Sequence, residues 1–463
     1  MAKVSLSGKP LTVNPLKVSQ PVGASLAFLG LARTMPLEHG ARGCTSFNKL
    51  FFMRHFREPI ALQTTAMDHV ATVLGSDGNV IEALLTIAAR NRPDVVGLIT
   101  TGLAETQGVD IDGTLKQFRR DHPEHAGMAV VPVSATDTLG CLETGFALAV
   151  RAIIDHLVPK SRVAGRRPDQ VTVLASSMLT PADIEAIKEW IAAFGLRAIV
   201  LPDLADSVDG HLIEEGYATL TYGGTTREDI ARVGESAATL VIGSSLDKAA
   251  DLLRERTGVP DYRFAGLMGL TDCDAFVHTL SRISGRPVPP AIARQRSQLQ
   301  DAIVDCHFTL ADVPVAIAAD ADLLASLGNY LADLGLRLAA AVASANTTQL
   351  TALSADEVVV GDLEDLENRA RAQDVSLLVA NSHGAELSAR LNLPLLRAGF
   401  PLYDNVGGHA RTWVGYRGSR QTVFELTNLL LARRREIPPY RSIYWQGTAR
   451  AEESWEAAAP CIV

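Results

Sequence analysis

Cys44 is the residue of this sequence that is best placed to do chemistry. It stands in the segment His-Gly-Ala-Arg-Gly-Cys-Thr-Ser-Phe, residues 39–47. Glycines let a backbone approach another group closely, and a cysteine in such a turn can present its sulfur outward. No second cysteine stands near it in the sequence. If Cys44 holds a metal cluster, it supplies one corner, and another polypeptide must supply the remaining ligands.

The other cysteines lie at 141, 273, 306 and 461. An odd total of five, wide spacing and a cytosolic setting make a disulfide framework improbable, and no CxxC pair indicates a local zinc or ferredoxin site. We expect Cys141, Cys273 and Cys306 to be small buried hydrophobes, the commonest role of a free cysteine.

Several familiar enzyme motifs are absent. The sequence contains no GxxxxGK[ST], HExxH, GxSxG or GxGxxG pattern, so nucleotide hydrolysis, zincin, α/β-hydrolase and dinucleotide-dependent mechanisms lack their usual residues. We expect His383, which follows a predicted strand, to be a hydrogen-bonded loop histidine rather than a ligand in a cleft. The charged cluster of Arg54, His55, Arg57 and Glu58 is interpreted as part of a subunit interface.

The composition predicts a cytoplasmic globular protein. Its 463 residues are 47% hydrophobic and 21% charged, which allows sizeable cores. A net charge of -9 argues against nucleic acid or an anionic membrane as a partner. No run approaches the roughly 18 apolar residues that a membrane span needs, and the first residues lack the apolar core of a signal peptide.

Short apolar strands alternate with helical patterns from about residue 90, which is typical of parallel α/β units. The clearest unit has a strand at 171–175 and a helix capped by Thr180, with Pro181 at its first position and Asp183 completing a capping box. Further strands are predicted at 197–201, 239–243, 313–318, 338–342, 358–362 and 376–380, and further helices at 246–255 and 322–334.

Two segments rich in glycine, proline, serine and charged residues, 160–170 and 283–300, are interpreted as linkers. They divide the chain into three predicted Rossmann-like domains with parallel sheets flanked by helices. The predicted boundaries are 1–160, 161–295 and 296–440, and the first domain carries Cys44. The alanine- and glutamate-rich end, 441–463, is predicted to be a tail.

The motifs of the chain resemble those of the nitrogenase component 1 family, from about residue 12 to 435. The resemblance is carried by Asn14-Pro15, Gln20-Pro21-Val22-Gly23-Ala24, Met35-Pro36, His39-Gly40, Gly43-Cys44, Arg54-His55-Phe56-Arg57-Glu58-Pro59, Thr100-Thr101-Gly102-Leu103-Ala104-Glu105 and Gly399-Phe400-Pro401. Within the family, the sequence is most similar to the β-type subunits that assemble the iron–molybdenum cofactor.

The resemblance implies a specific set of metal ligands. Nitrogenase β subunits carry three cluster-binding cysteines, at positions that read Ser19, Cys44 and Gly102 here. One thiolate is too few for the eight-iron cluster of the reductase. It can complete a [4Fe–4S] cluster, which takes four thiolates, when a partner donates three. Cys44 is therefore the expected metal ligand, while Ser19 and Gly102 are interpreted as packing and close-approach residues.

The resemblance also implies the partners and the role. An α-type subunit would complete an α2β2 heterotetramer with the [4Fe–4S] cluster at each αβ interface. The iron–molybdenum cofactor precursor, delivered by a donor protein, is expected on that α-type subunit, where the nitrogenase iron protein docks transiently. This chain would then be a non-catalytic assembly scaffold with no catalytic residue of its own.

Two alternatives remain open from the sequence. The first is a β subunit that acts directly in substrate reduction, in nitrogenase or in the related protochlorophyllide reductase. The residues at positions 19 and 102 count against nitrogenase. The second is a metal-free α/β enzyme or small-molecule binder, with Cys44 buried and a pocket formed by the loops that follow residues 243, 361 and 380.

Overall fold

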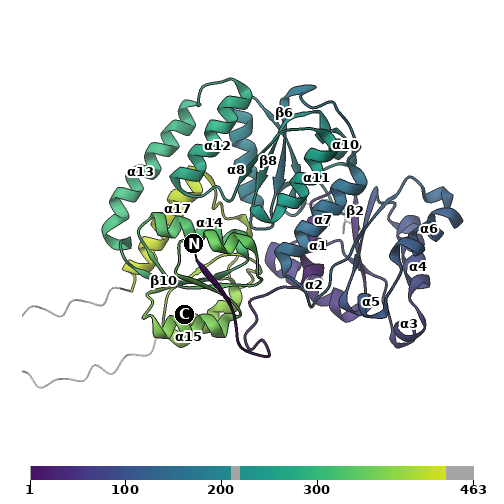
Figure 1. Ribbon diagram of the computed structural model, residues 1–463, viewed down its shortest axis with the longest axis horizontal. Coiled ribbons are helices and arrows are strands. Elements are labelled where there is room, and N and C mark those ends of the chain that lie inside the picture. The colour runs from purple at the N-terminus through teal and green to yellow at the C-terminus, as the bar shows by residue number, and fades with distance from the viewer. Residues whose placement is uncertain (1, 210–218, 434–463) are drawn as a thin grey trace, which may run out of the picture.

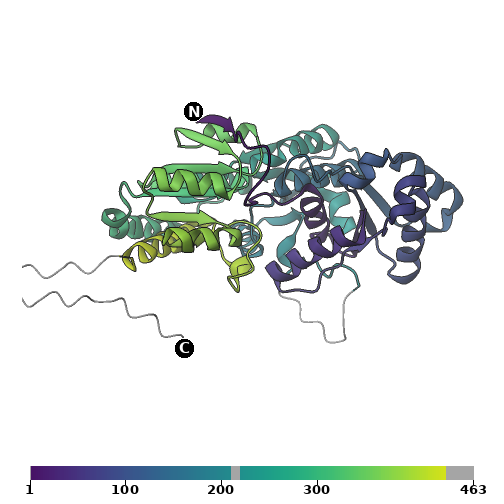
Figure 2. The same ribbon diagram turned by 90° about the horizontal axis from the view of Figure 1, so that it is seen from below.

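The computed structural model describes residues 2–209 and 219–433, and the predicted tail at 441–463 lies outside them. Three parallel β-sheets, each flanked by helices, form the described part of the chain (Figure 1). This is the predicted α/β class. Seen from below, the molecule is elongated, with the first sheet at one end and the third sheet at the other (Figure 2).

The first sheet has the order β3-β2-β4-β5. Its central strands are buried along their whole length, as parallel strands covered on both faces are, and β2 carries the buried polar residues Glu38 and His39 at its end. One face packs against α4 and α6 through Leu84 and Phe118, and the other packs against α1 and α7 through Phe28 and Phe146. The elements are α1 Gln20–Leu29, β2 Thr34–His39, α2 Arg42–Phe56, β3 Gln63–Thr64, α3 His69–Leu74, α4 Asp77–Arg90, β4 Val95–Thr100, α5 Gly102–Gln107, α6 Ile111–Asp121, β5 Ala129–Val133 and α7 Leu142–Leu157.

The second sheet has the order β7-β6-β8-β9. The predicted helix after its first strand is confirmed in detail, because Thr180 accepts a hydrogen bond from the Asp183 N–H and the Asp183 carboxylate accepts one from the Thr180 N–H. The elements are β6 Arg167–Ala175, α8 Pro181–Ala193, β7 Arg197–Leu201, α9 Leu204–Ser207, α10 Arg227–Arg232, β8 Ser236–Ile242, α11 Asp247–Thr257, β9 Asp261–Phe264 and α12 Gly269–Ser284.

The third sheet contains a strand from the beginning of the chain. Its order is β1-β12-β11-β10-β13-β14, and β1, Lys3–Leu6, pairs in parallel with Glu357–Val360. The predicted first domain, 1–160, therefore contributes a strand to the sheet of another predicted domain. The remaining elements are α13 Pro290–Leu310, β10 Pro314–Ala319, α14 Ala321–Asp333, β11 Arg337–Ala343, β12 Glu357–Val360, α15 Leu363–Ala372, β13 Leu377–Ala380, α16 Ala385–Leu391, β14 Leu395–Arg397 and α17 Gly415–Leu431.

The predicted linker at 283–300 is wrong. Helix α12 continues to Ser284, and α13 begins at Pro290 and runs for 21 residues. Proline is well suited to the first turn of a helix, where its missing N–H leaves no bond unmade. The prolines near 287–290 therefore mark a helix start and not a flexible connection. No helix among the described residues is long and apolar enough to cross a membrane.

The second and third sheets present their carboxyl ends to each other near the middle of the molecule. Asp322, just after β10, accepts hydrogen bonds from the backbone N–H and hydroxyl of Ser245, just after β8. The Asp322 N–H donates to Glu143 at the start of α7, 2.7 Å away. In Figure 1 the helices α1, α7 and α11 lie in this central region.

Candidate metal centre

Cys44 lies in the first turn of α2, shortly after β2 ends. Among the four cysteines in the described part of the chain, Cys44 is exposed, whereas Cys141, Cys273 and Cys306 are buried. The expectation for the three buried cysteines is confirmed. The alternative in which Cys44 is buried is wrong, because the helix starts at the surface and directs its first turn outward.

The end of β2 is held rigidly beneath this turn. His39 is fully buried, and its two ring nitrogens lie 2.8 Å from the Thr65 hydroxyl and 3.1 Å from the Ser76 hydroxyl. Burial lowers the pKa of His39 to about 4, so the ring is neutral at physiological pH. A side chain on Gly40 would lie 2.6 Å from the Thr101 hydroxyl oxygen. The shape of this turn thus depends on the absence of a side chain at residue 40.

The structure brings the loops that carry positions 19, 44 and 102 to the same edge of the first sheet. β2 and β4 are adjacent, with His39 opposite Thr100. The loop after β5 connects the loops that carry positions 19 and 102. Asp137 accepts a hydrogen bond from the Gly102 N–H, and the adjacent Thr136 N–H donates to the side chain of Gln20, the residue that follows Ser19.

Ser19 occupies the N-cap position of α1, but its hydroxyl accepts no hydrogen bond from the start of that helix. Ser19 therefore stands at the N-cap position without capping the helix through its side chain. Gly102 is the first residue of α5, and a side chain there would lie 3.2 Å from the Asp137 carboxylate. Gly102 is thus a close-approach residue, as the sequence predicted.

Two acidic residues near Cys44 were missed by the sequence analysis. Burial raises the pKa of the Cys44 thiol, and the negative charges of Asp137 and Glu38 raise it further. The sulfur is therefore a protonated thiol at neutral pH in the chain alone. Binding of iron would displace this proton, because a thiolate is the metal ligand.

Glu38 links the helices on both sides of β2. It is fully buried, and one carboxylate oxygen accepts hydrogen bonds from Ser25 of α1 at 3.0 Å and Asn48 of α2 at 2.8 Å. Its other oxygen has no hydrogen-bond partner in the described structure. Desolvation raises the pKa of Glu38, while Asn48, Thr45 and Ser25 counteract this by hydrogen bonding. This buried carboxyl therefore fixes the orientation of the helix that presents Cys44.

The start of α2 is open on its outer side. A side chain added at Gly43 would have no atom within 4 Å. No acidic residue lies in the first turn, and the N-cap residue, Ala41, has no side chain that could cap it. The backbone N–H groups of such a helix start favour a negatively charged ligand.

Apolar side chains surround this open turn. Along α2, Phe47, Leu50 and Met53 are exposed, and Leu139 is exposed in the loop that also carries Asp137. A group of exposed large apolar residues around one reactive side chain is typical of a surface that another protein covers. Within the described residues, no group of three His, Cys, Asp or Glu side chains could hold a metal ion.

The charged cluster at the end of α2 contacts the segment near residue 402 of the same chain. His55 is buried, and its Nδ1 accepts a hydrogen bond from the Leu402 N–H at 2.9 Å. Arg57 donates to the Tyr403 carbonyl at 2.9 Å, and the Arg54 guanidinium lies 4.2 Å from the centre of the Tyr403 ring. Arg54 and Arg57 remain exposed, so the subunit interface that the sequence favours for this cluster stays a prediction.

His383 is a hydrogen-bonding loop histidine, as predicted. Its Nδ1 lies 3.2 Å from the Pro15 carbonyl oxygen. The pocket suggested for a metal-free enzyme does not form as one site. The loops after residues 243, 361 and 380 line three different cavities, which include Ser244, Asp362 and Asn381 respectively.

Residues 19–431 match the family model described as nitrogenase component 1 type oxidoreductase. The chain is 44% identical to the nitrogenase iron-molybdenum cofactor biosynthesis protein NifN of Klebsiella pneumoniae, over 96% of each chain. It is 46% identical to the protein of the same name from Rippkaea orientalis, over 92% of this chain and 95% of that one.

The fold of the chain is also similar to that of solved nitrogenase structures. A chain of the structure described as "Nitrogenase Cp1 at pH 6.5" superposes with a TM-score of 0.87 at 30% identity, covering 92% of this chain and 95% of the other. A chain of "Nitrogenase Cp1 at pH 5" superposes with a TM-score of 0.69 at 13% identity, which shows the shared fold.

Proposed function

Because the chain belongs to the nitrogenase component 1 family, we propose that it is the β-type subunit of a NifE–NifN scaffold in the cytoplasm. On this scaffold the precursor of the iron–molybdenum cofactor is matured. The similarity to NifN proteins over nearly the whole chain supports this role. The chain is a structural and electron-relay subunit in this proposal and contributes no catalytic residue.

The observation that carries the proposal is the exposed thiol of Cys44 on an open helix start. It fits one corner of a [4Fe–4S] cluster, and Gly43 leaves room for a bulky inorganic group or a partner backbone to approach. The described residues offer no complete ligand set. A partner must therefore supply the other three thiolates, and we assign them to a NifE-like α-type subunit.

When bound, such a cluster supplies one-electron transfer. The residues of this chain hold and surround it. Cys44 binds as a thiolate after losing its proton, and the N–H groups at the start of α2 stabilise the negative charge. Glu38 holds α2 against α1, while the Asp137 carboxylate fixes the Gly102 backbone near the site.

The exposed apolar residues of α2 support the proposed partner surface. Phe47, Leu50 and Met53 would be covered by the α-type subunit around the cluster, and two such pairs would form the α2β2 heterotetramer. The cofactor precursor would rest on the α-type subunit, delivered by its donor, and the nitrogenase iron protein would dock transiently.

One observation favours a second candidate. The superposition on a nitrogenase component 1 chain fits a β subunit that takes part directly in substrate reduction. Ser19 and Gly102, which stand at two of the three cysteine positions, disfavour it. Acetylene reduction by the purified complex at rates typical of nitrogenase would support this second candidate over the scaffold.

The test is the iron content of the complex with the α-type partner. We expect about four irons per αβ pair in the wild type, following the four-thiolate rule. Cys44→Ala should lose at least half of this iron and change the electron paramagnetic resonance spectrum. Cys306→Ala, which removes a buried thiol on α13, is the control and should leave both unchanged. Unchanged iron and an unchanged spectrum in Cys44→Ala would refute the assignment.

A further inference from the structure

A second cavity of this chain does not include Cys44 in its lining. Its volume is about 460 Å³, and it lies where three parts of the chain meet. One wall is the face of α7 from Glu143 to Arg151, the second is the start of α11 with Ser244, Ser245 and Lys248, and the third is the loop Thr347–Gln349 after β11. Pockets at the carboxyl ends of parallel strands are common ligand sites in α/β proteins.

The floor of the cavity contains a buried acid with a free oxygen. Glu143 is 1% exposed, and its Oε2 accepts the hydrogen bond from the Asp322 N–H. Its Oε1 has no hydrogen-bond partner in the described structure. Burial raises the pKa of Glu143, and the charges of Asp322 and Asp320 raise it further. A raised pKa favours the protonated carboxyl, whose O–H can donate a hydrogen bond.

A second polar atom on the cavity wall is also unsatisfied. The Thr347 hydroxyl is buried without a partner among the described residues. Buried polar groups in folded proteins are nearly always hydrogen-bonded, to protein or to a bound molecule. Glu143 and Thr347 both line this cavity and each carries a buried oxygen without a partner, which favours a polar occupant.

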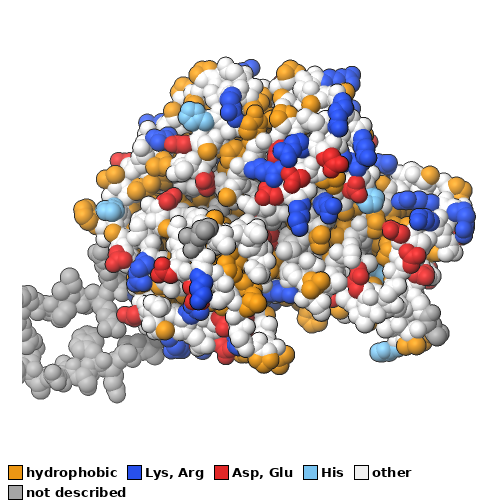
Figure 3. Space-filling model, viewed as in Figure 1, with side chains coloured by type: hydrophobic (Ala, Val, Ile, Leu, Met, Phe, Trp, Pro, Cys, Tyr) orange, Lys and Arg blue, Asp and Glu red, His pale blue; other side chains and the backbone are white. Residues whose placement is uncertain are grey.

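The rim carries two positive charges that are not neutralised. Arg151 and Lys248 have no hydrogen-bond or ion-pair partner within residues 2–209 and 219–433. Asp247, on the same rim, already pairs with Arg263 at 3.3 Å. Elsewhere over α11 basic and acidic side chains alternate on the surface, as Figure 3 shows. The net charge offered to an occupant is therefore positive.

We propose that this cavity binds a small organic anion, with its carboxylate or phosphate groups held by Arg151 and Lys248 and a hydrogen-bond acceptor facing Glu143. The hydroxyl groups of Ser244, Ser245 and Thr347 supply further hydrogen bonds. Charged hydrogen bonds from arginine and lysine are the usual means of binding such groups. Its lining does not include Cys44 but does include Gln20, which accepts a hydrogen bond from the Thr136 N–H beside the proposed metal centre.

The experiment is calorimetric titration of the full-length chain in complex with its α-type partner, using tricarballylate and inorganic phosphate as separate probes. We expect saturable binding of one of them, and which one binds identifies the anionic group. Arg151→Gln combined with Lys248→Gln should weaken the affinity at least tenfold. The matched control, Lys116→Gln with Arg119→Gln on the exposed face of α6, should change it less than twofold.

Two further variants test the role of the floor. Glu143→Gln keeps a hydrogen-bond donor and should retain the affinity within threefold, whereas Glu143→Met should weaken it at least tenfold. If Glu143→Met fails to fold, the rim variants decide, because their side chains are exposed. Absence of saturable binding, or equal weakening in the α6 control, would overturn the proposal. Cys44→Ala should leave anion binding unchanged, and the rim variants should leave the iron content unchanged.

Discussion

The starts of α2 and α15 are built alike and finished differently. In each case a parallel strand ends, a glycine follows, and the helix begins three residues after the strand: β2 ends at His39 and α2 begins at Arg42, while β12 ends at Val360 and α15 begins at Leu363. At α15 the cap residue, Asp362, accepts hydrogen bonds from the N–H groups of Glu364 and Asp365. At α2 the cap residue is an alanine.

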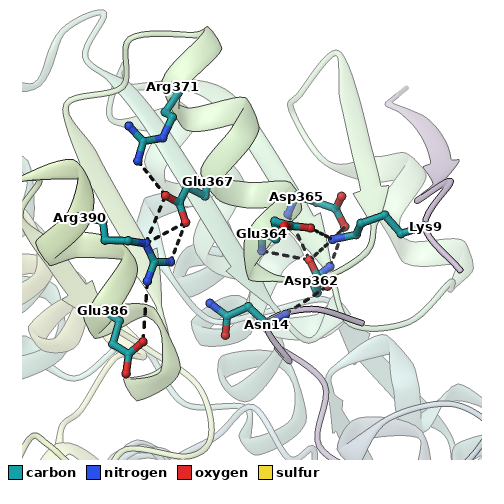
Figure 4. A network of polar contacts seen from close by, with 9 residues as sticks. All are labelled: Lys9, Asn14, Asp362, Glu364, Asp365, Glu367, Arg371, Glu386 and Arg390. Atoms are coloured by element: carbon teal, nitrogen blue, oxygen red, sulfur yellow. Dashed lines mark hydrogen bonds and ion pairs between the residues drawn. The ribbon is translucent and has the colours of Figure 1, made fainter. Parts of the chain in front are cut away.

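The chain itself closes the start of α15. Lys9 pairs with Asp362 at 2.5 Å and with Glu364 at 3.0 Å, and the Val13 N–H donates to Asp362 at 2.8 Å, so the N-terminal segment lies across this helix start (Figure 4). No segment of the described chain lies across the start of α2 in this way at Gly43. The backbone N–H groups at the start of α15 are thus hydrogen-bonded within the chain, whereas the start of α2, where we expect an external group to bind, has no side-chain cap.

Blocking the open helix start should give the largest effect. Gly43→Leu places a side chain in open space, so the isolated chain should melt within a few degrees of the wild type. Its affinity for the α-type partner should fall at least tenfold, measured by co-purification yield and titration. Gly78→Leu is the control, because Gly78 holds the equivalent position in α4 and is equally open. Equal affinity of the two variants would show that the open turn is ordinary surface.

Removing the cap of the closed helix start should lower stability. Asp362→Ala removes the hydrogen bonds to the first turn of α15 and the partner of Lys9, which should cost about 2–3 kcal/mol. The shift in the urea midpoint of unfolding measures this. Glu364→Gln, which keeps the cap, is the control and should cost less than about 1 kcal/mol. A negligible effect of Asp362→Ala would remove the contrast between the two helix starts.

Acid should weaken the support of α2 before that of α15. The pKa of His39 is about 4 in the folded chain and near 6.5 when unfolded, so its contribution is complete above pH 6.5 and is lost as pH falls toward 4. Burial would raise the pKa of Asp362, but hydrogen bonds from Lys9 and two backbone N–H groups hold it below its usual range, so its contribution is lost only below about pH 4.

The corresponding measurement compares urea midpoints at pH 7 and pH 5. The difference between wild type and His39→Gln should shrink by about 1–2 kcal/mol on going to pH 5, whereas the difference between wild type and Asp362→Ala should stay constant. Equal pH dependence of both differences would contradict the assigned protonation states.

The smallest expected effect is a difference in stability between two N-cap variants. Ser19 occupies an N-cap position without a side-chain hydrogen bond to its helix, whereas Thr180 makes one. Ser19→Ala should change stability by less than about 0.5 kcal/mol, because its hydroxyl makes no bond to the start of α1. Thr180→Ala should cost about 1 kcal/mol, because its hydroxyl accepts a bond from the Asp183 N–H. Similar costs for the two variants would indicate that Ser19 has a bonding partner after all.

Local patterns predicted most of the fold. The capping box at Thr180 and the apolar strands that end near residues 175, 242 and 342 depend on neighbouring residues, and the structure confirms them. The linker expected at 283–300 failed because prolines at a helix start and prolines in a loop look alike in sequence. The pairing of β1 with β12 could not be predicted, because it joins residues more than 350 positions apart.

For the candidate site, too, the sequence revealed local features and missed those that depend on distant contacts. Cys44 was singled out because a lone cysteine that follows two glycines is a local signal, and its exposure agrees with that prediction. Glu38 and Asp137 were missed because their importance depends on contacts with distant residues, Ser25 and Gly102. The intrachain contact of Arg57 was missed for the same reason, since its partner lies 346 residues later. An acidic residue inside an apolar strand, as at Glu38, was the available signal.

The pairing of β1 has a consequence for biosynthesis. Lys3–Leu6 cannot join the third sheet until Glu357–Val360 has left the ribosome. At roughly 5–20 residues per second, about 20–70 seconds pass between the two events. During that time the edge of a future sheet is exposed to other nascent chains. The strand at Lys3–Leu6 is therefore incorporated long after it is translated, and the third sheet is complete only once β14, Leu395–Arg397, has also emerged.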